Sequence, residues 1–128
     1  MKKYGLLLFL PVIILAFASC HKLQIAGIKK MGTENFTVEK WKIASQEKRG
    51  EMIYSFLNKY QVRGMTPEEI KKLLGPSTAY YNYDIDPAYW VGPKRIMHTR
   101  SDKSSSILAF PTNKKTGKIN SFVIDPMP

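Results

Sequence analysis

The single cysteine of this 128-residue chain lies directly behind an apolar run, and its position limits how the chain can fold. Residues 5–17 read GLLLFLPVIILAF, and Cys20 follows two small residues after that run. One cysteine cannot form an intramolecular disulfide or a zinc site with several cysteines. At this length we expect one domain, and its stability must come from a hydrophobic core.

Residues 1–19 have the order and size of a secretory signal peptide. Lys2 and Lys3 form a short basic region, the apolar run follows, and small residues end the segment. The run is shorter than the roughly 20 apolar residues that span a bilayer. The four residues Phe17-Ala18-Ser19-Cys20 resemble the bacterial lipobox, where cleavage leaves a diacylglyceryl cysteine. The sequence therefore predicts that Cys20 is the lipidated N-terminus of the mature protein.

Two other interpretations of this segment exist. The apolar run could be a buried helix of a cytosolic domain, or cleavage at Ala18 or Ser19 could leave Cys20 as a free exported thiol. Lipidation is favoured because it explains both the number and the position of the cysteine, whereas a lone thiol would be reactive. We expect attachment to the cell envelope, at the periplasmic face of the outer membrane.

The charge of the chain is strongly basic, with 20 Lys and Arg against 10 Asp and Glu. Such a balance usually indicates nucleic acid as a partner. Removing residues 1–19 takes away Lys2 and Lys3 and no acid, so 18 basic residues remain against 10 acidic ones, a formal charge of +8. Outside the cytoplasm nucleic acid is not the expected partner. Anionic lipid headgroups are the expected partner, because each basic side chain near such a surface contributes about 1 kcal/mol to binding.

The basic cluster that we expect to be most exposed is Lys94, Arg95 and Arg100, in a loop-rich stretch. It is a candidate contact for lipid headgroups or for an acidic protein surface. The alternative is that these charges serve only solubility.

The segment after the cysteine divides into a tether and a domain. Residues 20–35 carry isolated apolar side chains and two glycines, which predicts a flexible tether. The domain is expected over 36–128, where 36–44 could be an extended lead-in or a loose turn. Residues 47–60 predict an amphipathic helix. Its apolar face is Met52, Ile53, Phe56, Leu57 and Tyr60.

A second, shorter helix is predicted over 67–74 by its start and stop signals. Thr66 is an N-cap before Pro67 at the first helical position, and a glutamate three residues after Thr66 completes a capping box. Gly75 supplies the left-handed residue that ends the helix, and the proline that follows it prevents the helix from continuing. The expected buried face is Ile70, Leu73 and Leu74.

The second half of the domain has the composition of strands. Aromatic and β-branched clusters predict strands near 80–83, 88–91, 105–110 and 119–124. The last two would form a hairpin around 111–118, with Asn113 and Gly117 in its turn. Strand alternation places Ile107 with Ala109, and Ile119 with Phe122 or Ile124, toward the helices.

The sequence offers few groups for catalysis. It contains no P-loop, dinucleotide-binding or serine-nucleophile motif. His21 and His98 do not form a metal-binding spacing, and Asp84 with Asp86 fits a turn better than an acid–base pair. The aromatic residues near 80–90 could form a carbohydrate or peptide platform, although core and edge filling is the commoner role. We expect no enzyme activity, cofactor, metal or small-molecule substrate.

The segment Gly64 to Pro76, reading GMTPEEIKKLLGP, resembles the helix motif of the SmpA/OmlA family, the BamE-like small bacterial lipoproteins. Residues 89–93 (YWVGP) resemble the family's following aromatic strand, and 117–119 (GKI) resemble the opening of its last strand. Trp41-Lys42 with Arg49 and Met52 resembles the N-terminal helix of many BamE-like domains. The resemblance covers about residues 36–125.

The resemblance implies an α+β domain with two helices packed on a three-stranded antiparallel sheet. It implies a non-enzymatic binding or assembly accessory in the envelope, with a protein partner in outer-membrane protein assembly or envelope integrity. The alternative is a module of the same fold that binds a soluble target as a ligand-binding protein or an enzyme inhibitor.

Overall fold

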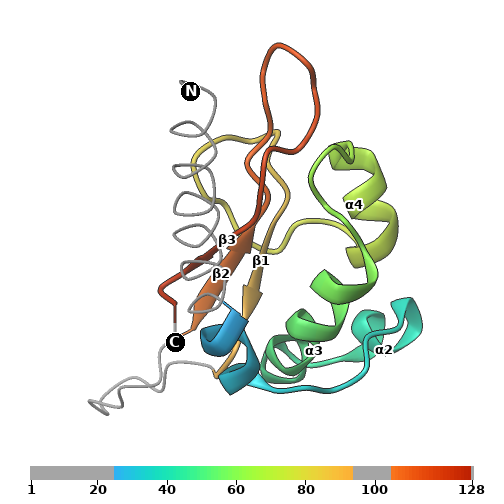
Figure 1. The fold of residues 1–128 in the computed structure, drawn as a ribbon, viewed down its shortest axis with the longest axis vertical. Helices are drawn as coiled ribbons and strands as arrows, with labels where there is room; N and C mark the ends of the chain where they lie inside the picture. Colours follow the sequence, from blue (N-terminus) through green and yellow to red (C-terminus); the bar gives the residue numbers. More distant parts are fainter. Residues whose placement is uncertain (1–24, 94–104, 128) are drawn as a thin grey trace, which may run out of the picture.

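A computed structural model describes residues 25–93 and 105–127 as helices packed on one side of a small sheet (Figure 1). The sheet has three antiparallel strands in the order β1-β2-β3. The α+β class and this sheet are as predicted, but the described residues contain four helices rather than two. A first helix spans residues 25–31. The labelled elements are α2 (Val38–Ile43), α3 (Gln46–Lys59), α4 (Pro67–Leu74), β1 (Ala88–Val91), β2 (Ser106–Ala109) and β3 (Val123–Asp125).

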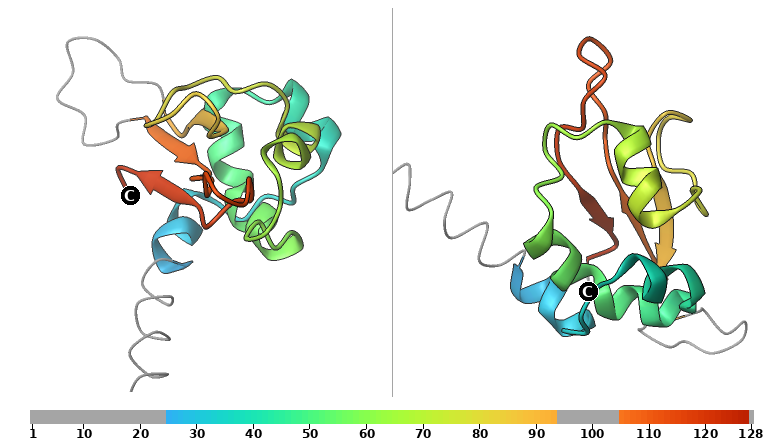
Figure 2. Two further views of the ribbon diagram at one scale, coloured as in Figure 1. Left: turned by 90° about the horizontal axis from the view of Figure 1, so that it is seen from above. Right: turned by 90° about the vertical axis from the view of Figure 1, so that its right-hand side faces the viewer.

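The register of the sheet aligns one buried residue from each strand. Tyr89 of β1 pairs with Leu108 of β2, which pairs with Ile124 of β3, and all three are buried. Their shared face carries the core, and Figure 2 shows α2, α3 and α4 on that side of the sheet. The prediction that Ile107 and Ala109 face the helices was wrong by one position, and a one-residue shift turns every side chain of a strand to the other face.

The helix α3 matches the prediction closely. Ser45 caps it by accepting a hydrogen bond from the backbone N–H of Lys48. The side chains of Met52, Ile53 and Phe56 are fully buried, and the remaining two residues of the predicted face are partly buried against the same core. The apolar spacing thus identified the face that packs on β1.

The helix α4 also has the predicted bounds, with Thr66 as its N-cap and Gly75 at its end. The Thr66 hydroxyl accepts from the backbone N–H of Glu69 at 3.2 Å, and Gly75 at φ +79° donates its N–H to a carbonyl of the last turn. Of the three predicted core residues, Ile70 and Leu74 are buried. Leu73 is only partly buried, because it lines the rim of the pocket described below.

The tether prediction is corrected for residues 25–35. Residues 25–31 form a helix whose Ile28 is 2% exposed and belongs to the core, and Met31 packs against that core. The backbone N–H of Glu34 donates to the carbonyl of Glu51 in α3, which fixes the next segment. The packed domain therefore includes residue 25, well before the predicted boundary at 36.

The region predicted as a first strand, 80–83, forms an irregular loop instead, and a turn follows at 84–85. The backbone N–H of Asp86 donates to the carbonyl of Tyr83, and the buried Asp86 carboxylate accepts the N–H of Thr112 at 3.0 Å. The turn interpretation of Asp84 and Asp86 is confirmed.

The hairpin turn is held by the two predicted residues. The Asn113 side chain accepts from the N–H groups of Lys115 and Thr116, and Gly117 adopts φ +70°. The last strand begins at Val123 rather than at residue 119. Ile119 is buried and forms an isolated bridge with Thr112.

Candidate functional site

The site residues predicted from the sequence, Cys20 and the cluster Lys94, Arg95 and Arg100, lie outside the described residues. So do His21, His98 and the export signal, and all of these stay predictions. Within 25–93 and 105–127, no group of three or more His, Cys, Asp or Glu residues could hold a metal ion. No helix in these ranges is long and apolar enough to cross a membrane.

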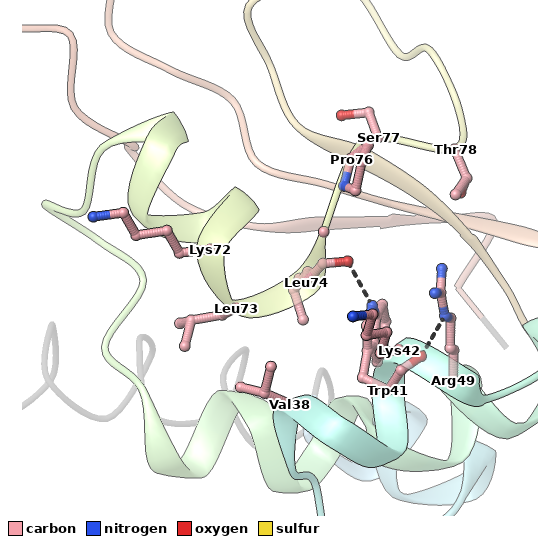
Figure 3. Close-up of a pocket in the computed structure, with 11 residues that line it drawn as sticks. Val38, Trp41, Lys42, Arg49, Lys72, Leu73, Leu74, Pro76, Ser77 and Thr78 are labelled. Carbon is pink, nitrogen blue, oxygen red and sulfur yellow. Dashed lines mark hydrogen bonds between the residues drawn. The ribbon is translucent and has the colours of Figure 1, made fainter.

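A pocket of about 500 Å³ lies between α2, the C-terminal end of α4 and the segment 75–78 (Figure 3). Its lining combines three cationic side chains, an apolar floor and two hydroxyl groups, and it contains no acidic residue. This volume lies within the range of ordinary ligand sites, about 300–1,000 Å³. The lining residues are Val38, Trp41, Lys42, Arg49, Lys72, Leu73, Leu74, Gly75, Pro76, Ser77 and Thr78.

Trp41 fixes the floor of the pocket. Its side chain is 1% exposed, and its indole N–H donates to the carbonyl of Leu74 at 2.8 Å, joining α2 to the end of α4. The ring makes edge-to-face contacts with Phe36 and Tyr89, both with centroids 6.0 Å away. A buried tryptophan needs a partner for its N–H, and here that partner is a carbonyl that the helix end leaves open.

Arg49 stands over the tryptophan. Its Nε donates to the carbonyl of Trp41 at 3.0 Å, and its Cζ lies 4.9 Å from the centroid of the Trp41 ring. These two contacts fix the plane of the guanidinium, and Figure 3 shows its outer nitrogens directed toward the segment carrying Ser77 and Thr78. Burial lowers the pKa of Arg49 from its ordinary value, yet arginine stays protonated at neutral pH.

The segment 75–78 is held along the outer edge of β1. The Ser77 and Thr78 hydroxyls accept the backbone N–H groups of Ala88 and Trp90, and the N–H of Thr78 donates to the carbonyl of Ala88. This pairing covers the free edge of the strand. Each hydroxyl that accepts a hydrogen bond still has its own proton to donate.

The same segment is anchored from the core by Tyr89. The Tyr89 hydroxyl donates to the carbonyl of Gly75 at 2.7 Å. Burial raises the pKa of Tyr89 above its ordinary value, so the phenol keeps its proton and remains a donor. The rim and the floor of the pocket are thus both fixed to the core.

Two lysines complete the basic lining. Lys42 lies in the last turn of α2 and Lys72 in the last turn of α4, and both are exposed. Cations at these places also interact favourably with the negative ends of the helices. Figure 3 shows the Lys42 amino group beside Trp41 and the Lys72 amino group on the far side of α4. The ion pairs found among the described residues, Lys40–Glu34 and Lys48–Glu51, use no lining residue.

A second surface carries exposed aromatic side chains. Tyr80, Tyr83 and Trp90 are 60%, 50% and 42% exposed, and the Lys114 amino group lies 3.8 Å from the centroid of the Tyr83 ring. Of the aromatic residues interpreted as core and edge filling, Tyr89 is buried in the core and Trp90 lies on the edge strand β1, whereas Tyr80 and Tyr83 are exposed in the loop before it. Tyr80 and Tyr83 lie in the loop before β1, and Trp90 lies on β1 itself, on the face opposite to that of Tyr89.

The pocket was missed by sequence reasoning, although its parts were visible. Trp41, Lys42 and Arg49 stood out only through the family resemblance, and no local motif links them to Ser77. Two residues could have indicated these helices from the sequence. Thr37 caps the start of α2 and Ser45 caps the start of α3, each through its side chain.

No family model matches the chain, and no curated protein or solved structure matches it.

Proposed function

We propose that the protein is a lipid-anchored lipoprotein of the cell envelope that acts as a non-enzymatic binding accessory, and that the basic pocket binds its protein partner. The observation that carries this proposal is the lining of the pocket. The Lys42 and Arg49 cations lie beside an apolar floor, and no acidic residue belongs to the lining. Such a surface is complementary to a ligand that is both anionic and apolar.

The fixed frame of the pocket supports binding as its role. Trp41 and Arg49 are held by hydrogen bonds to backbone carbonyls, and the rim is held to β1. A site whose side chains are already ordered loses less entropy when a ligand binds.

The envelope location and the assembly role rest on the sequence. The basic start, the apolar run and the small residues before Cys20 support lipid attachment. The resemblance of residues 64–76 to the SmpA/OmlA helix motif supports an accessory role in outer-membrane protein assembly or envelope integrity. The predicted contact of Lys94, Arg95 and Arg100 with headgroups or an acidic protein surface remains part of the same proposal.

The location is tested by fractionation of cells that express Cys20→Ser. We expect an unprocessed precursor that is lost from the outer-membrane fraction, whereas the unaltered protein stays there with a lipid-modified Cys20. Mass spectrometry that finds an unmodified mature terminus at another residue would refute lipidation.

The binding role is tested by in-cell crosslinking followed by purification of the protein with its partners. Lys42→Glu reverses one charge at the pocket, and Lys48→Glu reverses one charge outside it as a matched control. We expect the first variant alone to lose the partner. Retention of the partner by both variants, or loss by both, would contradict a role for the pocket.

A second candidate function is an inhibitor or ligand-binding module for a soluble target. The exposed Tyr80, Tyr83 and Trp90 favour it, because aromatic side chains are enriched where proteins bind one another. This candidate predicts that Tyr83→Ala with Trp90→Ala abolishes capture of the target while Lys42→Glu does not.

A further inference from the structure

The charge of the pocket selects an anionic ligand. Lys42 and Arg49 supply the positive charge of its lining, which contains no acidic residue, and the ion pairs of the described residues lie elsewhere. Arg49 is partly withdrawn from water, and its charge is not neutralised by a carboxylate among the lining residues. An anion that binds in the pocket would therefore make up for the water contacts that the Arg49 guanidinium loses through burial.

The geometry of Arg49 selects a planar anion. Its Nε is occupied by the carbonyl of Trp41, and its Cζ lies over the indole ring, 4.9 Å from the ring centroid. The two outer nitrogens are directed toward the segment that carries Thr78 (Figure 3). A guanidinium held in this way binds a carboxylate through paired parallel hydrogen bonds.

The apolar half of the pocket requires more than a bare anion. Val38, Leu73 and Pro76 line it beside the basic half, and about 500 Å³ accommodates a large side chain together with a carboxylate. Phosphate alone would leave this apolar surface exposed to water. A protein segment with an apolar residue next to a Glu or Asp satisfies both halves.

We infer that the pocket binds the carboxylate of an acidic protein segment, with Arg49 as the clamp and the neighbouring apolar side chain of the ligand against Val38 and Leu73. This inference rests on the proposed function and names the chemistry of the partner. The Lys42 charge strengthens the attraction at the opening, and Thr78 lies on the side of the rim that faces Arg49.

The test uses the intrinsic fluorescence of Trp41. The chain has two tryptophans, so Trp90→Phe leaves Trp41 as the only one, directly beneath Arg49. The full-length protein in a non-ionic detergent is titrated with acetyl-Phe-Glu-Gly-amide and, separately, with acetyl-Phe-Gln-Gly-amide. These peptides differ in one carboxylate and in no other charge. Calorimetry on the chain without the tryptophan change gives an independent affinity.

We expect saturable binding of the Glu peptide and at least about tenfold weaker binding of the Gln peptide, the loss that follows removal of a bidentate charged contact. Arg49→Lys keeps the charge but loses the planar guanidinium, so it should weaken binding of the Glu peptide by about tenfold. Lys42→Gln should weaken it by about threefold at low salt and by less as salt screens the charge. Lys48→Gln is the matched control and should bind as the unaltered chain does.

Three results would overturn the inference. The first is equal binding of the two peptides, and the second is no binding of the Glu peptide. The third is a larger Trp41 response to inorganic phosphate or to phosphatidylglycerol vesicles than to the Glu peptide, which would make the pocket a phosphate or membrane site. Circular dichroism confirms folding, and if Arg49→Lys does not fold, the peptide pair and Lys42→Gln still decide the outcome.

The two proposals fail separately. If the Glu peptide does not bind but Lys42→Glu still abolishes partner capture in cells, the carboxylate inference is wrong and the binding role of the pocket stands. If Lys42→Glu leaves partner capture unaffected and the Glu peptide binds, the pocket recognises carboxylates but is not where the partner docks.

Discussion

Trp41 is the residue on which the architecture of the pocket depends most. It packs among Phe36 and Tyr89, donates to the end of α4 and carries Arg49 on its ring. One side chain thereby sets the distance between two helices and the orientation of the clamp. The sequence shows only an apolar residue in an ambiguous segment, because the carbonyl of Leu74 lies 33 residues away along the chain.

Trp41→Phe should lower the free energy of unfolding by about 1–3 kcal/mol, because the carbonyl of Leu74 loses its donor and the core loses volume. Chemical denaturation measures this difference. Trp90→Phe is the control, and its cost should stay below about 0.5 kcal/mol because that side chain is 42% exposed. Equal effects of the two substitutions would show that Trp41 does not join the helices.

Tyr89 should make stability depend on pH in the alkaline range. Burial raises its pKa in the folded protein above the ordinary value of about 10. The unfolded chain therefore loses this proton first as pH rises. The neutral phenol's contribution to the free energy of unfolding is thus complete below about pH 10 and declines above it. The stability difference between the unaltered chain and Tyr89→Phe should shrink from pH 9 to pH 11. A difference that stays constant or grows would contradict a buried neutral phenol.

At the scale of elements, local signals predicted the helices that carry their own caps. α4 was predicted to the residue from Thr66, Pro67 and Gly75, because each acts on its nearest backbone groups. The helix at residues 25–31 and α2 were not predicted as helices, because both are short and owe their stability to packing against α3 and the core.

The strands show a related contrast. β1 was predicted correctly, but the face of β2 was not, because its register depends on Tyr89 and Ile124 in other strands. The segment 80–83 has strand composition but forms an irregular loop that presents Tyr80 and Tyr83 to solvent. Propensity alone cannot distinguish a strand from an exposed aromatic loop.

Gly50 shows packing overriding helix propensity inside α3. Alanine is about 1 kcal/mol better than glycine within a helix. A Cβ at this position would lie 2.8 Å from the backbone nitrogen of Gly92, which donates to the carbonyl of Gln46. Gly50→Ala should therefore destabilise the protein by about 1–3 kcal/mol, the usual cost of overpacking.

Thermal and chemical denaturation of Gly50→Ala measure this effect. Glu47→Ala, at an exposed position of the same helix, should change stability by less than about 0.5 kcal/mol. A stabilised Gly50→Ala protein would mean that α3 does not approach Gly92 as closely as the structure has it.

At the scale of the whole molecule, the candidate site is a product of the tertiary fold. Its parts come from α2, α3, the end of α4 and the segment along β1, spread over residues 38–78. Composition indicated a basic chain but not where the charges converge, and the cluster at 94–100 stays a prediction. The pocket and the exposed aromatic surface are separate candidates for the partner, and we assign the partner to the pocket.

The most direct test of that assignment is site-specific photo-crosslinking in intact cells. A photoreactive residue is placed at position 42 or 72, at the pocket, and at position 83 or 90, on the aromatic surface. We expect an envelope protein to be crosslinked from positions 42 and 72, at a yield that falls when Arg49→Lys is added. Crosslinking from 83 and 90 alone, or at equal yield from all four positions, would contradict the claim that the pocket binds the partner.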